Sequence, residues 1–165
     1  MVAKILQHDE TAITWRNTGG SELFTATSLA AGAGRQGAMH DLTTSARSRR
    51  FAWRAFLKPG ATRVVKEAIR IYIKTGSGAT AGTRPDNDDG TGDIAVSAED
   101  KLENLLQIGT IRIDENAAVE MVANGLVILP HRWVAPVMWN ATANSLSATA
   151  ADFGFDLTPI PLESQ

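Results

Sequence analysis

The chain has 165 residues, of which 44% are hydrophobic, and its formal net charge is −2. This size and hydrophobic content suit one domain that folds around its own core. Cysteine is absent, which excludes disulfides, thiolate metal sites and cysteine nucleophiles. The small net charge gives no global attraction to nucleic acid or anionic lipid, and no apolar run is long enough to span a bilayer.

Residues 1–11 are expected to form an N-terminal arm, followed by a single β-sandwich domain over residues 12–162. The first letters, MVAKILQHDE, turn polar too early for a signal peptide, so we expect no secretory leader. Segments 11–17 and 21–29 are expected strands on either side of a turn at Gly19-Gly20.

Residues 32–37 read GAGRQG, which fits the glycine pattern of dinucleotide-binding folds. That pattern should follow a buried strand, open a helix and precede an acidic residue by about 20 positions. Here the preceding stretch is polar, and no acidic residue lies between Asp41 and Glu67. We therefore expect no dinucleotide cofactor, and interpret residues 32–37 as a flexible glycine loop between two β elements.

Two segments alternate with the period of a β-strand. In RRFAWRAFLKPG (49–60) one face carries Phe51, Trp53, Ala55 and Leu57, and the other carries Arg50, Ala52, Arg54 and Phe56. In EAIRIYIKTG (67–76) one face carries Ile69, Ile71 and Ile73, and the other carries Arg70, Tyr72 and Lys74. Such alternation indicates an antiparallel sheet with one solvated face.

The second half of the chain predicts further strands. LLQIGTIRID (105–114) changes its apolar phase at Gly109, which indicates a β-bulge. AVEMVANGLVILP (118–130) is interpreted as a hairpin, because Asn124-Gly125 suits a type I′ turn. RWVAPVMWNAT (132–142) and ADFGFDLTPI (151–160) supply the last two strands.

The region between these strands predicts one short helix and one long loop. SAEDKLENLL (97–106) is the helix, with Ser97 as its cap. Residues 75–95 are poor in large apolar side chains, so we expect an exposed, mobile loop. Its acidic run from Asp86 to Asp93 fails the EF-hand pattern, and a solvated loop tip is preferred over a calcium site. The expected fold is an all-β, antiparallel, jelly-roll-like sandwich.

No catalytic or metal site is predicted. The sequence has no G-x-S-x-G motif, its carboxylates are scattered, and His8, His40 and His131 are widely spaced. Trp133 and Trp139 would favour a glycan platform if exposed and coplanar, whereas burial of both would dismiss one.

A basic group surrounds two aromatic residues, a combination that also occurs in nucleic-acid-binding proteins. It comprises Arg47, Arg49, Arg50 and Arg54, with Phe51 and Trp53 interleaved. The two aromatic residues have the parity of the core face, and the chain is not basic overall. Protein contact is therefore ranked above nucleic acid for these arginines.

Four stretches together resemble a family of small tailed-bacteriophage virion proteins. They are TSLAAGAGRQGAMHDLTTSARSRRFAWRAFLKPGA, AIRIYIKTGSGATAGT, LLQIGTIRI and FDLTPI, and the resemblance covers about Trp15 to Ile160. The shared features are a glycine-rich GRQG stretch, a following arginine-rich strand and a closing LTPI strand. Members resemble capsid decoration, or cement, proteins with β-sandwich folds.

The resemblance implies a virion structural protein without catalysis or cofactor, located on the capsid surface after assembly in the host cytoplasm. Its partners would be the major capsid protein and copies of itself, as a homotrimer. The expected contact residues are Arg35, Gln36, Arg47, Arg49 and Arg50. The glycines around Arg35 either allow close approach of a partner or serve tight turns. A neck, tail or fibre station and a carbohydrate-binding module remain the alternatives.

Overall fold

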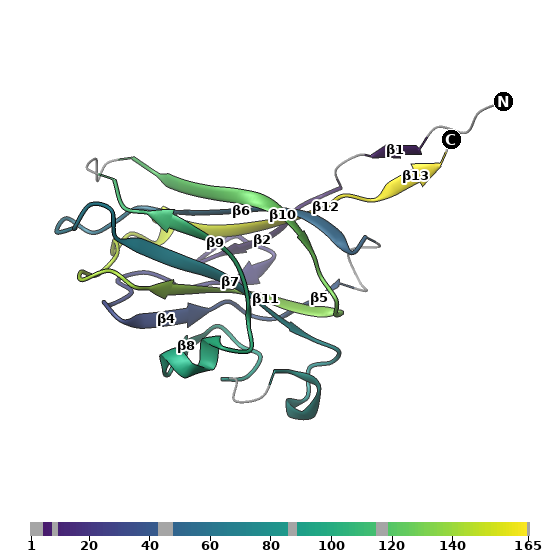
Figure 1. Cartoon of the computed structure of the whole chain (residues 1–165), viewed down its shortest axis with the longest axis horizontal. Helices are drawn as coiled ribbons and strands as arrows, with labels where there is room; N and C mark the ends of the chain where they lie inside the picture. Colours follow the sequence, from purple (N-terminus) through teal and green to yellow (C-terminus); the bar gives the residue numbers. More distant parts are fainter. Residues whose placement is uncertain (1–4, 8–9, 43–47, 86–88, 115–118, 165) are drawn as a thin grey trace.

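The computed structural model describes residues 5–7, 10–42, 48–85, 89–114 and 119–164, with side chains described for these ranges between 10 and 161. Two β-sheets pack face to face (Figure 1). The five-stranded sheet has the order β10 (Met121–Ile128), β6 (Arg50–Leu57), β12 (Phe153–Pro159), β2 (Ile13–Arg16) and β3 (Glu22–Leu23). The second sheet has the order β8 (Ile94–Val96), β4 (Ala33–Gln36), β11 (Trp133–Asn140), β7 (Ala68–Gly76) and β9 (Leu106–Arg112), with β5 (His40–Asp41) also paired to β11.

The strand order is that of a jelly roll. When β2, β4, β6, β7, β9, β10, β11 and β12 are counted from first to eighth, one sheet has the order 6-3-8-1 and the other 2-7-4-5. Two interlocked Greek keys give this arrangement, which brings the first and last long strands together. The sequence-based expectation of an all-β, jelly-roll-like sandwich is confirmed.

The core lies between the sheets and is built from the inward parity of their strands. The five-stranded sheet contributes buried Trp15, Phe51, Trp53, Phe153, Phe155 and Leu157, and the other contributes Ile69, Ile71, Ile73, Ile111, Val134 and Met138. Each large apolar side chain that leaves water stabilises the fold by about 1.5–3 kcal/mol. The predicted inward faces of segments 49–60 and 67–76 are therefore confirmed.

Both ends of the described chain form a separate two-stranded ribbon. β1 (Ile5–Gln7) pairs antiparallel with β13 (Leu162–Ser164). Figure 1 shows this ribbon projecting from one end of the sandwich. The expected N-terminal arm therefore contains a strand that pairs with the C-terminal segment.

The predicted hairpin at Asn124-Gly125 is wrong. β10 runs without interruption from Met121 to Ile128, and all eight residues pair in register with β6. The glycine has a packing role instead, because a Cβ at Gly125 would lie 3.0 Å from Nε1 of Trp53. Packing against an indole ring and a type I′ turn both select glycine, so local sequence does not separate them.

Two strand irregularities follow from single residues. β9 pairs Gly109 with Ile71 and Gln107 with Tyr72, which leaves one extra residue and confirms the predicted bulge. Pro136 lies within the central strand β11, opposite the break between β4 and β5. Proline has no N–H for the ladder, and its carbonyl accepts a hydrogen bond from the amide of Gly37.

Two of the three residues expected on a solvated outer face of β7 are buried, whereas the side chain of Arg70 is 41% exposed. Tyr72 and Lys74 are 6% and 1% exposed. Tyr72 belongs to a second apolar cluster with Val96, Leu102, Val137 and Trp139. Segments that follow β7 in the chain fold back over this face, so the alternation in the strand does not report exposure.

The predicted helix is shorter than expected. It is a 3-10 turn, η2 (Glu99–Leu102), which begins after Ala98, and two more such turns are η1 (Ala81–Thr83) and η3 (Ala150–Asp152). Ser97 does not cap η2, because its hydroxyl donates to Asp89 at 2.8 Å. In the described part of segment 21–29 only Glu22–Leu23 is a strand, and it pairs parallel to β2.

Candidate interaction surface

The GAGRQG stretch is part of a sheet and is not a flexible loop. Gly34, Arg35 and Gln36 lie in β4, which pairs with β11 on one side and β8 on the other. A Cβ at Gly34 would lie 2.7 Å from the ring of Trp139, and one at Gly37 would lie 2.8 Å from the ring of Trp15. These two glycines therefore allow tryptophan rings to pack against the backbone.

Arg35 makes an ion pair inside the chain. Its Nε and Nη2 each donate to the carboxylate of Asp93 at 2.8 Å, and Thr25 donates to the same carboxylate through its amide and hydroxyl. Burial raises the pKa of Asp93, but the hydrogen bonds from Arg35 and Thr25 outweigh it and hold the pKa below its ordinary value. Arg35 thus fastens the segment before β8 to the sheet.

The side chains of Gln36 and Lys74 bind the main chain of the same segment. The amide of Gln36 donates to the carbonyl oxygens of Gly90 and Gly92 at 3.1 and 3.0 Å. The ammonium of Lys74 donates to Oε1 of Gln36 at 2.9 Å and also to the Gly90 carbonyl. Residues 89–96 therefore form a fastened cover over β4 and β7, and the mobility expected for residues 75–95 stays a prediction.

Three of the four arginines in the predicted group, Arg49, Arg50 and Arg54, lie among the described residues. Arg47 lies outside the described residues. Arg49 and Arg50 are both exposed and lie at the start of β6. Arg50 pairs across the ladder with Ile128 of β10, so this basic end lies beside the outer face of the five-stranded sheet.

An apolar row lies on that outer face. It comprises Val122, Leu126 and Ile128 of β10, which are 43%, 59% and 73% exposed. Leu126 pairs with Ala52, which in turn pairs with Thr158, and these small neighbours leave a shallow hollow of about 410 Å³. Three branched side chains on one face of the strand, with Asn124 between Val122 and Leu126, form a patch of the kind that marks interaction sites.

Charged side chains border the apolar row. Arg54 forms ion pairs with Glu120 and, at 3.6 Å, with Asp156, and Arg16 also pairs with Asp156. The guanidinium groups of Arg16 and Arg54 lie 4.8 and 4.6 Å from the ring centroid of Phe56. This cation–π cover explains why Phe56 is buried although its parity places it on the outer face.

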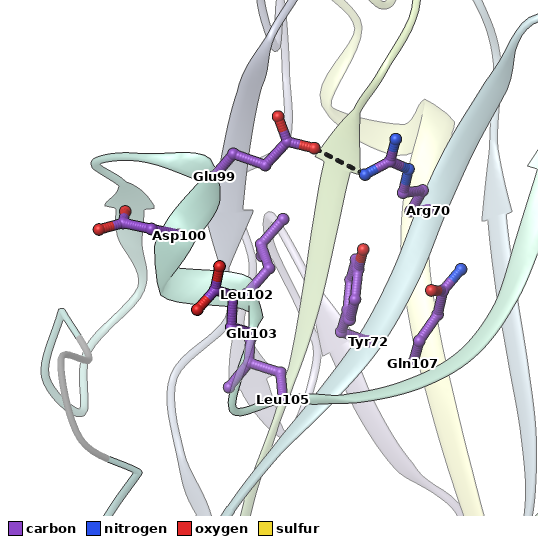
Figure 2. Close-up of a pocket in the computed structure, with 8 residues that line it drawn as sticks. All are labelled: Arg70, Tyr72, Glu99, Asp100, Leu102, Glu103, Leu105 and Gln107. Atoms are coloured by element: carbon purple, nitrogen blue, oxygen red, sulfur yellow. Dashed lines mark hydrogen bonds and ion pairs between the residues drawn. The ribbon is translucent and has the colours of Figure 1, made fainter.

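A cleft of about 580 Å³ opens on the other sheet (Figure 2). Tyr72 and Gln107 line one wall, and Leu102, Glu103 and Leu105 line the opposite wall. At its mouth Arg70 donates to Glu99 at 2.7 Å, and hydrogen bonds with Tyr72 and Glu99 raise the pKa of Arg70. The pair joins η2 to β7, and the lining side chains include no serine or histidine.

The tryptophans do not form the exposed platform that glycan binding requires. Trp139 is 5% exposed and packs in the second apolar cluster, and Trp133 at the other end of β11 is half-buried. Trp15 and Trp53 lie in the main core. The coplanar, exposed pair of Trp133 and Trp139 is therefore not present.

The described residues gather no metal-binding group of three or more histidine or acidic side chains. His40 pairs with Glu22 at 2.7 Å, His131 is exposed, and His8 lies outside the described residues. Asp86 and Asp88 also lie outside them. Asp89 accepts a hydrogen bond from Ser97, whereas Asp93 accepts hydrogen bonds from Arg35 and Thr25. Among the described residues no helix has the length and apolarity to cross a membrane.

No known protein-family model matches the chain, and no curated protein matches its sequence. The fold and surface define its class at the level of architecture: a jelly-roll sandwich with one covered sheet and one sheet that carries an exposed apolar row.

Proposed function

We propose that this protein is a structural component of a tailed-phage virion that binds the capsid surface as a decoration protein. Its partners are the major capsid protein and other copies of itself, arranged as a homotrimer. The proposal is supported by the sequence resemblance and by a jelly-roll architecture, which viral capsid proteins share with lectins and cupins. Since one fold serves many functions, the argument depends on the surface.

The observation that carries the proposal is the apolar row of Val122, Leu126 and Ile128 beside the basic end at Arg49 and Arg50. Apolar side chains supply the buried centre of a protein contact, and arginines are enriched in such contacts. A stable contact buries about 800 Å² on each partner, which a sheet face can provide. Arg35 and Gln36 are engaged inside the chain, so the proposed capsid contact moves to the five-stranded sheet.

Binding to shells tests this proposal directly. Capsids of the encoding phage, assembled without this protein, are mixed with purified protein and sedimented, and the bound fraction gives the Kd. The double charge reversal Arg49→Glu and Arg50→Glu should weaken binding roughly tenfold or more, because it reverses the field beside the contact.

Arg112→Glu is the matched control, because Arg112 is also exposed but lies on β9 of the other sheet. It should leave binding unchanged. Equal binding by the parent protein, the double variant and Arg112→Glu would show that the outer face of the five-stranded sheet is not the capsid contact. Binding to neck or tail structures and not to shells would instead place the protein at the alternative station.

A further inference from the structure

The strand β10 is an edge of the five-stranded sheet. Its residues, MVANGLVI, include no charge and no proline, and they pair in an unbroken register with β6. In the described part of the chain β10 has no other sheet partner. An edge strand of this length and composition is a template for pairing with another chain.

The other sheet edges are protected in recognised ways. β3 and β8 are two and three residues long, and β9 contains a bulge and ends on a charged side chain, Arg112. Short edges, bulges and charges all discourage strand addition. Of the four outermost strands of the two large sheets, three are protected and β10 is not, which singles out β10 as the edge available for a partner strand.

The direction of the main-chain groups in β10 follows from one hydrogen bond. The amide of Leu129 donates to the carbonyl of Arg49 at 2.9 Å, toward β6. In an antiparallel ladder, residues alternate between pointing toward and away from a given neighbour. The amides and carbonyls of residues 122, 124, 126 and 128 therefore point away from β6, on the same residues that carry the apolar row.

From this geometry we propose that β10 pairs antiparallel with β10 of a second copy, across a two-fold axis at Gly125. Val122 then lies opposite the partner's Ile128, and Asn124 lies opposite the partner's Leu126. About eight main-chain hydrogen bonds form, because each outward residue exchanges two with its opposite. The two five-stranded sheets become one continuous sheet, whose outer face carries the apolar rows of both copies side by side.

The register is selected by side-chain chemistry. An axis at Asn124 would also align the outward main-chain groups, but it would place Ile128 opposite the partner's Glu120. The axis at Gly125 instead places Val122 opposite Ile128, and apolar and β-branched cross-strand pairs stabilise a sheet. Antiparallel pairing also brings the Glu120 end of one copy beside the Arg49 and Arg50 end of the other, which gives charge complementarity.

This inference rests on the proposed function only in assigning the apolar row to protein contact. A two-fold contact yields even numbers of copies, so in a trimeric protein it would join two trimers. It concerns the purified protein without a shell, so a failure here leaves capsid binding intact, and a failure to bind capsids leaves this contact intact.

Sedimentation equilibrium and native mass spectrometry of the full chain provide the first test. We expect species with even copy number, and Ile128→Lys should weaken their association roughly tenfold or more by placing charges in the apolar row. Ile94→Lys is the matched control, because Ile94 is an exposed apolar residue on β8, and it should not change the mass. A monomer, or a trimer unaffected by Ile128→Lys, would overturn the proposal.

Cysteine cross-linking tests the register, and the chain has no native cysteine to interfere. Opposite residues in hydrogen-bonded pairs have Cα atoms about 5.5 Å apart, which a disulfide spans. The double variant Asn124→Cys, Leu126→Cys should form covalent dimers on oxidation, and Asn124→Cys alone should not. Dimers from the single variant, or none from the double variant, would contradict the axis at Gly125. Both positions are exposed, so folding is retained.

Discussion

The outer face of the six-stranded sheet is covered by its own chain, whereas the outer face of the five-stranded sheet carries exposed apolar side chains. The covered face buries Tyr72, Lys74 and Trp139 beneath residues 89–102. The open face presents Leu126 and Ile128 at 59% and 73% exposure. Both faces are formed by strands of alternating pattern. Their difference in exposure arises because a segment between strands folds over one face and no described segment covers the apolar row on the other.

The largest expected difference between the two faces is in stability. Trp139→Ala should lower the free energy of unfolding by about 3–5 kcal/mol, because it leaves a cavity beneath the cover. Ile128→Ala on the open face should change it by no more than about 0.5 kcal/mol. Urea unfolding followed by circular dichroism measures both, and similar losses for the two variants would contradict the contrast.

A second variant tests how the cover is fastened. Arg35→Ala should cost about 1–3 kcal/mol, because it leaves the Asp93 carboxylate, 3% exposed, with only the amide and hydroxyl of Thr25 as donors among the described residues. Amide hydrogen exchange should become faster at residues 89–93. Arg49→Ala, at an exposed position, serves as the control. Unchanged exchange together with lost capsid binding would return Arg35 to the role of a partner contact.

The fastening should also depend on pH. A carboxyl group whose pKa is lowered by folding stabilises the fold above its ordinary pKa, here 3.8, and loses that contribution as the pH falls through the folded value. Stability measured at a series of acidic pH values should therefore fall less steeply in Asp93→Asn than in the parent. The pKa of Asp152 is lowered too, since hydrogen bonds from Ser147 and Lys58 outweigh burial. The variant Asp152→Asn therefore measures how much of the acid-induced loss of stability comes from Asp152 and not from Asp93.

The smallest expected effect is on the open face itself. Leu126→Gln should leave the free energy of unfolding within about 0.5 kcal/mol of the parent, because this side chain is 59% exposed. The same substitution should reduce the binding of a hydrophobic dye, measured by its fluorescence. A loss of stability above about 1 kcal/mol would show that the row is packed within the chain.

Strand alternation was sufficient to predict the inward side of the sandwich. Phe51, Trp53 and Leu57 alternate in sequence and point into one core, and so do Ile69 and Ile71. The outward side was less predictable, because its exposure depends on segments distant in sequence. Lys74 has the parity of a solvated residue but is buried by contact with Gln36 and Gly90.

The candidate surface was missed for a local reason. Interpreting Asn124-Gly125 as a turn assigned the two halves of β10 to opposite arms of a hairpin, which hid the common face of Val122, Leu126 and Ile128. The exposed Arg50 at the edge of that face was predicted from its strand parity. Arg35 was identified as a residue of interest, but its partner Asp93 lies 58 positions away and no local pattern connects them.

The pairing of β2 with β12 has a consequence for synthesis of the chain. Trp15 meets Phe155 in the ladder, so β2 acquires its antiparallel neighbour only after residues 153–159 have been translated. Contacts between such distant residues slow the folding of β proteins, because the chain must close a large loop first. The growing chain therefore carries β2 without its antiparallel neighbour until β12 has left the ribosome.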